Sequence, residues 1–273
     1  MDLKPHSSSN AVLEGAIDPA ILVGRLAVRD ALEGVESQNA AHELATAQLC
    51  YRRYTVPILE ATTLLEERNL TEAARWATIQ VLFGLSLRHM DNVLDSPGSL
   101  QSTAEESYLA NAYLSRAQAM LHDAGSSWTP GHAALHGQFY SYEVEMRGGS
   151  MHDMSTLWRR ASPLCVLLEI DLADRLRDER LIGLYRCYLS TMLLLADCND
   201  AWGDAQHGPP TPVTLLLGES RTRDSMDFSA AASRILQIRA FAHREREGLL
   251  QSLEILGCTR WATVLREDAS VGF

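Results

Sequence analysis

The chain has 273 residues, of which 46% are hydrophobic, and its formal charge is −11 at pH 7. This acidic balance argues against nucleic-acid binding, because a phosphate backbone requires a basic protein face. Lys4 is the only lysine, so 23 of the 24 basic residues are arginines. Contacts that need a cationic side chain must therefore use the planar guanidinium of arginine.

Apolar residues recur at i, i+3, i+4 and i+7 along most of the chain, which predicts one helix after another. The expected helices span residues 19–35, 38–67, 71–95, 105–123, 131–147, 153–176, 178–204, 226–256 and 258–266. No internal repeat or long linker separates them. We therefore expect an all-α protein, with a flexible N-terminal tail over 1–12 and a single helical domain over 13–273.

The cellular compartment is predicted from the cysteines and from the apolar segments. Five cysteines are scattered singly, without a C-x-x-C pair, which predicts a reduced, cytoplasmic protein without disulfides or a zinc site. The first ten residues lack the apolar region of a signal peptide. The apolar runs are also far shorter than the ~18 residues that a transmembrane helix requires.

A first group of acidic residues closes the apolar helix expected over 71–95. Asp91 and Asp95 are four residues apart, so both carboxylates lie on one helix face about one turn apart. A cation between them would relieve their repulsion, and Mg²⁺ prefers such oxygen ligands. The alternative is an ordinary helix end that runs into solvent before Ser96 and Pro97.

A second group follows the apolar segment 188–196. Asp197, Asp200 and Asp204 stand at i, i+3 and i+7, which again forms one stripe. Three carboxylates at the end of a buried helix are costly unless they are paired or bind a metal. The alternative is three solvated acids that precede a Gly-Pro-Pro turn.

The two acidic groups are about 105 residues apart and could face each other across a helical bundle. Together they would clamp a cluster of Mg²⁺ ions, which can hold a diphosphate as a leaving group. An apolar cavity between the same helices would receive a hydrocarbon. Phe83, Gly84 and Leu87 lie where its floor is expected, and Trp202 follows the second group. For each aromatic residue, packing in the core is the alternative.

The order of these motifs resembles the trans-isoprenyl diphosphate synthases and the class I terpene synthases. Residues 91–95 are similar to the family's D-D-x-x-D motif, with Asn92 at its second position. Residues 196–204 are similar to the second motif, D-D-x-x-D-x-x-G-D, with Ala196 in place of the first aspartate. Between them, Gln138 follows a glycine as in the family's G-Q pair.

Two further positions complete the resemblance. Arg160 stands at the lysine of the family's x-x-K-T-A/G segment. In an alternative alignment, Asn199, Asp200 and Gly203 are similar to the N-D-x-x-S/T/G-x-x-x-E motif of terpene cyclases, with His207 in place of the glutamate.

The resemblance implies a single-domain orthogonal helical bundle of the class I isoprenoid synthase type, which forms a homodimer. It implies a cofactor of up to three Mg²⁺ ions and an allylic prenyl diphosphate as substrate. The implied metal ligands are Asp91, Asp95, Asp197, Asp200 and Asp204, of which Asp91, Asp95 and Asp200 are the expected catalytic residues. The implied substrate-binding residues are Arg160, Arg88, Arg147, Asn92, Asn199, Gln138, Phe83, Leu87 and Trp202.

The chain departs from the chain-elongating members of the family. Their isopentenyl diphosphate site uses an early G-G-K-x-x-R-P motif and an R-R-G after the first aspartate motif, and neither is present here. We therefore expect a terpene cyclase. The alternatives are a prenyltransferase of the moenomycin-pathway type, with another acceptor, and a non-catalytic partner subunit of a prenyl diphosphate synthase.

Overall fold

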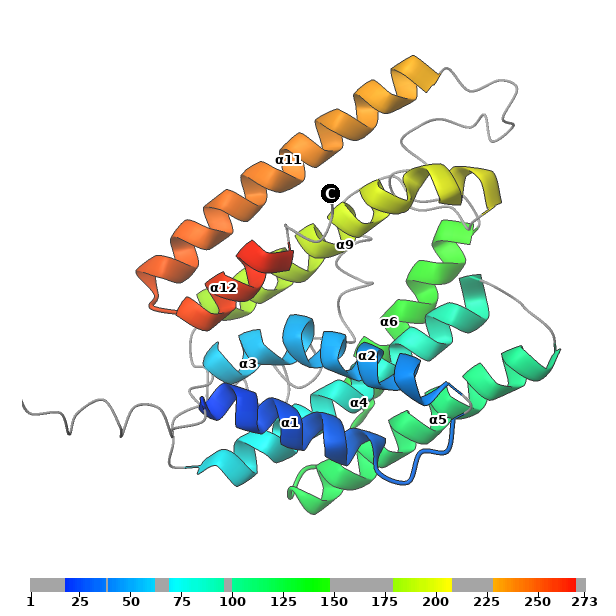
Figure 1. The fold of residues 1–273 in the computed structure, drawn as a ribbon, viewed down its shortest axis with the longest axis vertical. Helices are drawn as coiled ribbons and strands as arrows, with labels where there is room; N and C mark the ends of the chain where they lie inside the picture. The colour runs from blue at the N-terminus through cyan, green and yellow to red at the C-terminus, as the bar shows by residue number, and fades with distance from the viewer. Residues whose placement is uncertain are drawn as a thin grey trace, which may run out of the picture.

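The computed structural model describes residues 18–37, 39–61, 69–95, 100–147, 179–207 and 228–268. Within these ranges, every element is a helix (Figure 1). The elements are α1 (Pro19–Leu32), α2 (Ala40–Cys50), η1 (Tyr51–Thr55), α3 (Val56–Ala61), α4 (Leu70–Asp95), α5 (Leu100–Asp123), α6 (Pro130–Arg147), α9 (Glu179–His207), α11 (Phe228–Ile255) and α12 (Thr259–Asp268).

The all-α prediction is confirmed for the part of the chain that the structure describes. The finer expectation, an isoprenoid synthase bundle, stays a prediction. The expected helix over 153–176 and the tail over 1–12 lie outside the described residues. None of the described helices combines the length and the hydropathy needed to cross a membrane.

Helix starts follow from short polar side chains next to prolines. At α1, the Asp18 carboxylate accepts a hydrogen bond from the Ala20 N–H at 2.9 Å, and Pro19 occupies the first helical position. At α6, the Thr129 hydroxyl accepts from the His132 N–H at 3.3 Å. Each cap satisfies an N–H group that has no partner within its own helix.

The helix expected over 38–67 is observed from Ala40 to Ala61, but it changes its pitch in the middle. The segment η1 is one turn of π-helix, in which the Val56 N–H donates to the Tyr51 carbonyl five residues earlier. Pro57 explains this turn, because its ring would collide with the carbonyl four residues before it and it has no N–H to donate.

Two glycines allow this distorted helix to pack closely against its neighbours. A Cβ atom at Gly24 of α1 would lie 2.6 Å from Cε1 of Tyr51, and one at Gly84 of α4 would lie 3.1 Å from Sγ of Cys50. The Tyr51 hydroxyl also donates to the Ala20 carbonyl at 2.7 Å, which holds the ring against α1.

The hydrophobic core is organised around α4, which packs most extensively against α5 and α1. One buried cluster joins α4 to all the other α-helices of the described chain. Its largest fully buried side chains include Trp261, Tyr113, Tyr185, Tyr188 and Phe83. A second, smaller cluster joins the later half of α9 to α11 through Leu194, Cys198, Ala201, Ile235 and Ala242.

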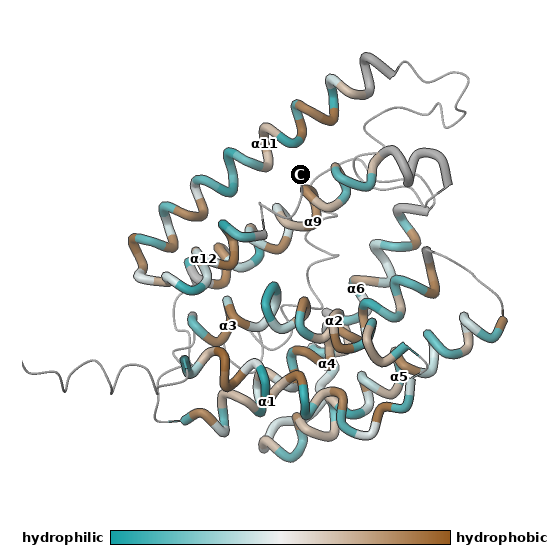
Figure 2. The backbone as a smooth tube through the Cα atoms, in the orientation of Figure 1, coloured by the Kyte–Doolittle hydropathy of each residue, from teal (hydrophilic) through white to brown (hydrophobic). Residues whose placement is uncertain are grey.

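The arrangement of the helices sets where their ends lie. In the view of Figure 1, α9, α11 and α12 lie above α1–α5. Both α4 and α9 run from left to right, so their C-terminal ends lie on the same side of the molecule. Figure 2 shows hydrophilic and hydrophobic residues alternating along α11, as expected for a helix that packs through one face.

Candidate functional site

The first acidic group lies in the last turns of α4. Asp91 is buried, with 9% of its surface exposed, at the end of a nearly continuous run of buried residues. Its Oδ2 accepts a hydrogen bond from the Arg88 guanidinium at 3.3 Å, and the Arg88 side chain is 56% exposed. Arg88 therefore lies next to the buried carboxylate, with its side chain still in contact with solvent. Asp95 is the last residue of α4, and its side chain lies outside the described structure.

The second acidic group lies in the later half of α9. Asp197 is buried at 6% exposure, beside the buried residues Cys198 and Ala201. Asn199 and Asp200 are exposed. The stripe predicted from the sequence therefore begins inside the fold and reaches the surface within one turn.

The two acidic groups are carried on the same side of the fold, since α4 and α9 end there (Figure 1). Carboxylate oxygens are suitable ligands for Mg²⁺. Among the described side chains, no three His, Cys, Asp or Glu residues are grouped closely enough to hold a metal ion. The magnesium site therefore stays a prediction.

The residues expected at the cavity floor lie in the main core. Phe83 and Leu87 are buried, and the Phe83 ring lies 5.7 Å from the ring of Trp128 between centroids. Gln138 of α6 is half-buried. Arg160 and the side chains of Arg147, Trp202 and Asp204 lie outside the described part of the chain.

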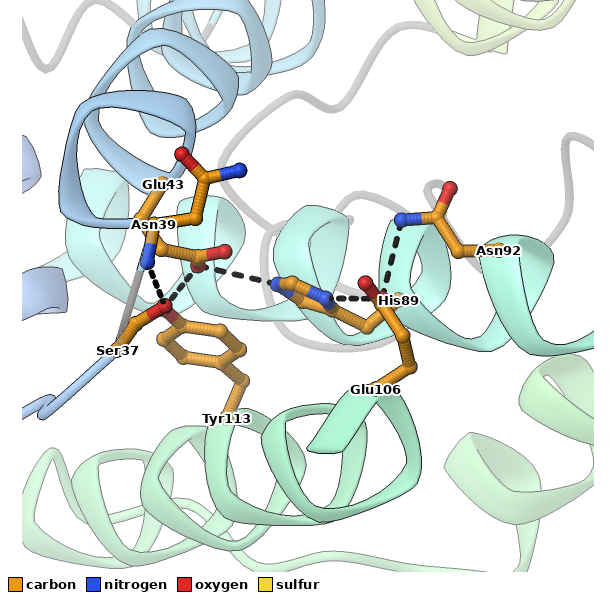
Figure 3. A network of polar contacts seen from close by, with 7 residues as sticks. All are labelled: Ser37, Asn39, Glu43, His89, Asn92, Glu106 and Tyr113. Atoms are coloured by element: carbon orange, nitrogen blue, oxygen red, sulfur yellow. Dashed lines mark hydrogen bonds and ion pairs between the residues drawn. The ribbon is translucent and has the colours of Figure 1, made fainter. Parts of the chain in front are cut away.

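A buried polar network that the sequence did not reveal adjoins the first acidic group (Figure 3). His89 Nε2 lies 3.1 Å from Oε2 of Glu43 in α2, and His89 Nδ1 lies 2.8 Å from Oε2 of Glu106 in α5. The Tyr113 hydroxyl donates to the same Glu43 oxygen at 2.6 Å, and its ring stacks on His89 at 5.4 Å. Asn92 Nδ2 donates to Oε2 of Glu106 at 3.0 Å.

The charges in this network follow from its geometry. Burial alone would lower the pKa of His89, but its hydrogen bonds to Glu43 and Glu106 outweigh burial and raise that pKa. Burial alone would raise the pKa of Glu43, but hydrogen bonds from His89 and Tyr113 hold that pKa below its ordinary value. Burial, followed by the contact with the Glu43 carboxylate, raises the pKa of Tyr113.

His89 thus lies between two carboxylates, which favour its charged form, the form in which both ring nitrogens donate. The network ties three helices together, since Glu43 belongs to α2, His89 and Asn92 to α4, and Glu106 and Tyr113 to α5. It ends at Asn92, the residue next to Asp91. The network thus holds α4 against α2 and α5 beside the first acidic group.

Comparison with known proteins gives no relative: no family model matches the chain, and neither does any curated protein or solved structure.

Proposed function

We propose that this protein is a Mg²⁺-dependent isoprenoid synthase that ionises an allylic prenyl diphosphate, and that it acts as a terpene cyclase. One observation supports this most: two long helices each bury an aspartate in their later half, and the C-terminal ends of both lie on one side of the fold (Figure 1). Carboxylates placed in this way offer the oxygen ligands that Mg²⁺ prefers. A site for metal ions and an anionic substrate provides a reason to retain them.

The roles of the individual residues follow from their positions. Asp91 and Asp95 on α4, and Asp197, Asp200 and Asp204 on α9, would hold the metal ions. Bound Mg²⁺ would supply the electron withdrawal that makes diphosphate a good leaving group.

Arginine contacts would complete the diphosphate site. Arg88 is placed to bind a diphosphate oxygen, because its guanidinium already lies beside Asp91 and its side chain reaches solvent. Arg160 would provide a second such contact.

The proposed reaction begins when the allylic C–O bond breaks and its electron pair leaves with the diphosphate. The carbocation then either loses a proton to give a hydrocarbon or adds water to give an alcohol. The apolar residues of α4 before Arg88, including Phe83 and Leu87, would exclude bulk water from that cation. Because the sequence lacks the isopentenyl diphosphate motifs, closure of the chain on itself is favoured over elongation.

The direct test is incubation of the purified protein with Mg²⁺ and C10, C15 or C20 allylic diphosphates. Extraction and gas chromatography would detect hydrocarbons or alcohols, and a phosphate assay would follow diphosphate release. We expect cyclic products with at least one chain length. Release that requires an added acceptor would indicate a prenyltransferase. Absence of turnover with every substrate and acceptor would refute both enzymatic functions and favour the non-catalytic partner subunit.

Two substitutions connect the reaction with the acidic groups. Asp91→Asn and Asp200→Asn should each reduce turnover by about 10²-fold or more, because each removes a charge from a metal site. Asp123→Asn is the matched control, since that aspartate is well exposed at the end of α5. Equal activity in all three variants would show that the acidic groups are only solvated helix ends.

A further inference from the structure

Asn92 of α4 donates a hydrogen bond to a carboxylate of the neighbouring helix α5. Its Nδ2 lies 3.0 Å from Oε2 of Glu106, and the same oxygen lies 2.8 Å from Nδ1 of His89. A single carboxylate oxygen on α5 therefore receives two N–H groups from α4 (Figure 3). The sequence alone showed only that an amide stands where the resembled motif has its second aspartate.

The orientation of the Asn92 amide follows from the donors around it. An ionised carboxylate only accepts hydrogen bonds, so Oε2 of Glu106 accepts from the groups that reach it. An accepting carboxylate requires an N–H from residue 92, which fixes Nδ2 towards Glu106. The carbonyl oxygen Oδ1 is consequently turned away from Glu106, and it is the atom of this amide that a metal ion or its bound water can use.

An aspartate at position 92 would not fit the same place. It would set a carboxylate oxygen about 3 Å from Oε2 of Glu106, with no donor between them, and two carboxylates so close repel each other strongly. The departure from the resembled motif is thus matched by a residue on the next helix.

We propose that Glu106 is a positioning residue that requires asparagine at position 92. By accepting from Nδ2, it turns the Asn92 carbonyl oxygen towards the first acidic group, where Mg²⁺ would bind. This inference rests on the proposed function for its metal. It goes beyond the resemblance, which assigns no role to Glu106 and places Asn92 among the substrate-binding residues, not among the metal ligands. Glu106 is itself held in place, since His89 is braced on its other side by Glu43 and stacked on Tyr113.

The pairing is tested by a double-mutant cycle of Asn92→Asp, Glu106→Gln and the two together, with urea unfolding followed by circular dichroism. We expect Asn92→Asp to lower the folding equilibrium constant by about tenfold or more, since it opposes two carboxylates. Glu106→Gln should lower it less. The double variant should recover stability, because the amide introduced at position 106 can donate to the carboxylate introduced at position 92 and accept from His89. Additive losses in the double variant would overturn the pairing.

The positioning role is tested by Mn²⁺ binding, measured as the loss of the free-ion signal in electron paramagnetic resonance. We expect Glu106→Ala, which removes the acceptor for Asn92, to weaken Mn²⁺ binding by about tenfold, a typical effect of removing an outer-shell partner, while the variant stays folded. The double variant should bind at least as tightly as the wild type, because it supplies a carboxylate oxygen at position 92. Glu105→Gln, one residue away on α5, should leave binding unchanged.

The outcomes separate this inference from the proposed function. If the wild type binds Mn²⁺ and Glu106→Ala binds it equally well, the positioning role is wrong and the metal site stands. If the folded wild type binds no Mn²⁺, both the positioning role and the proposed function are wrong. In that case, non-additive stabilities would still establish that Glu106 selects asparagine at position 92.

Discussion

Replacing Glu43 with glutamine removes one negative charge from the buried network and keeps the size of the side chain. The Glu43 side chain is 5% exposed, and its Oε2 accepts from the Tyr113 hydroxyl at 2.6 Å and from His89 Nε2 at 3.1 Å. A hydrogen bond to a charged group contributes about 1.5–3 kcal/mol, against about 1 kcal/mol for a neutral one. Glutamine can still accept both bonds as a neutral group, so we expect a loss of about 1–3 kcal/mol.

The size of this loss should depend on pH. The pKa of Glu43 is lowered in the folded protein, because hydrogen bonds from His89 and Tyr113 outweigh the raising effect of burial. A lowered pKa means that the stabilisation is complete above the unfolded-state value of about 4.3 and is lost as pH falls through the folded-state value. The difference in unfolding free energy between wild type and Glu43→Gln should therefore shrink as pH falls below about 4.

The measurement is urea unfolding of both proteins by circular dichroism, repeated from pH 7 to the lowest pH at which the wild type remains folded. Glu36→Gln is the control, because Glu36 is exposed, and it should change stability by less than about 0.5 kcal/mol. Two results would refute the reasoning: equal stability of Glu43→Gln and wild type at pH 7, or an unchanged difference between them in acid.

Other substitutions and labels test the packing. Gly24→Ala should cost about 1–3 kcal/mol, since its Cβ would lie 2.6 Å from the Tyr51 ring. Gly248→Ala has open space around the added methyl group and should instead stabilise α11 by about 0.5–1 kcal/mol. Both variants are measured by urea unfolding. Equal effects would contradict the close approach of Gly24 to the Tyr51 ring. Glu60→Ala should cost about 1 kcal/mol or more, because the Glu60 carboxylate accepts hydrogen bonds from two backbone N–H groups at the start of α12. An unchanged melting temperature would show that this cap contributes nothing. Burial raises the pKa of Cys50 to about 12, so iodoacetamide should modify it only after unfolding, which peptide mass spectrometry would detect.

The helical architecture could be predicted from the sequence because long amphipathic segments carry a strong periodic signal. The expected helix over 71–95 agrees with α4 within one residue, and the expected 131–147 agrees equally well with α6. The π-turn in the helix expected over 38–67 does not follow from that signal. Periodicity reports which residues face the core, whereas the pitch change depends on how one proline ring meets a carbonyl one turn earlier.

The candidate site could be predicted only in part. Asp91 and Asp197 each follow an apolar segment of the sequence, which was compatible with their burial but equally with solvated helix ends. The partners of His89 could not be predicted, because Glu43 and Glu106 lie 46 and 17 residues away. The available signal was weak: Glu43 shares a helical stripe with residues that pack inwards.

The two candidate acidic groups depend on different parts of the core. The one on α4 ends a helix that is surrounded by the main cluster and braced by His89. The later half of α9 instead packs on α11, where Cys198 and Ala201 meet Ile235 and Ala242. Because α9 is continuous from one cluster to the other, its acidic end is held both by the main core and by the packing on α11. Substitutions at Ile235 or Ala242, which carry no candidate ligand, should therefore affect the proposed site through α9.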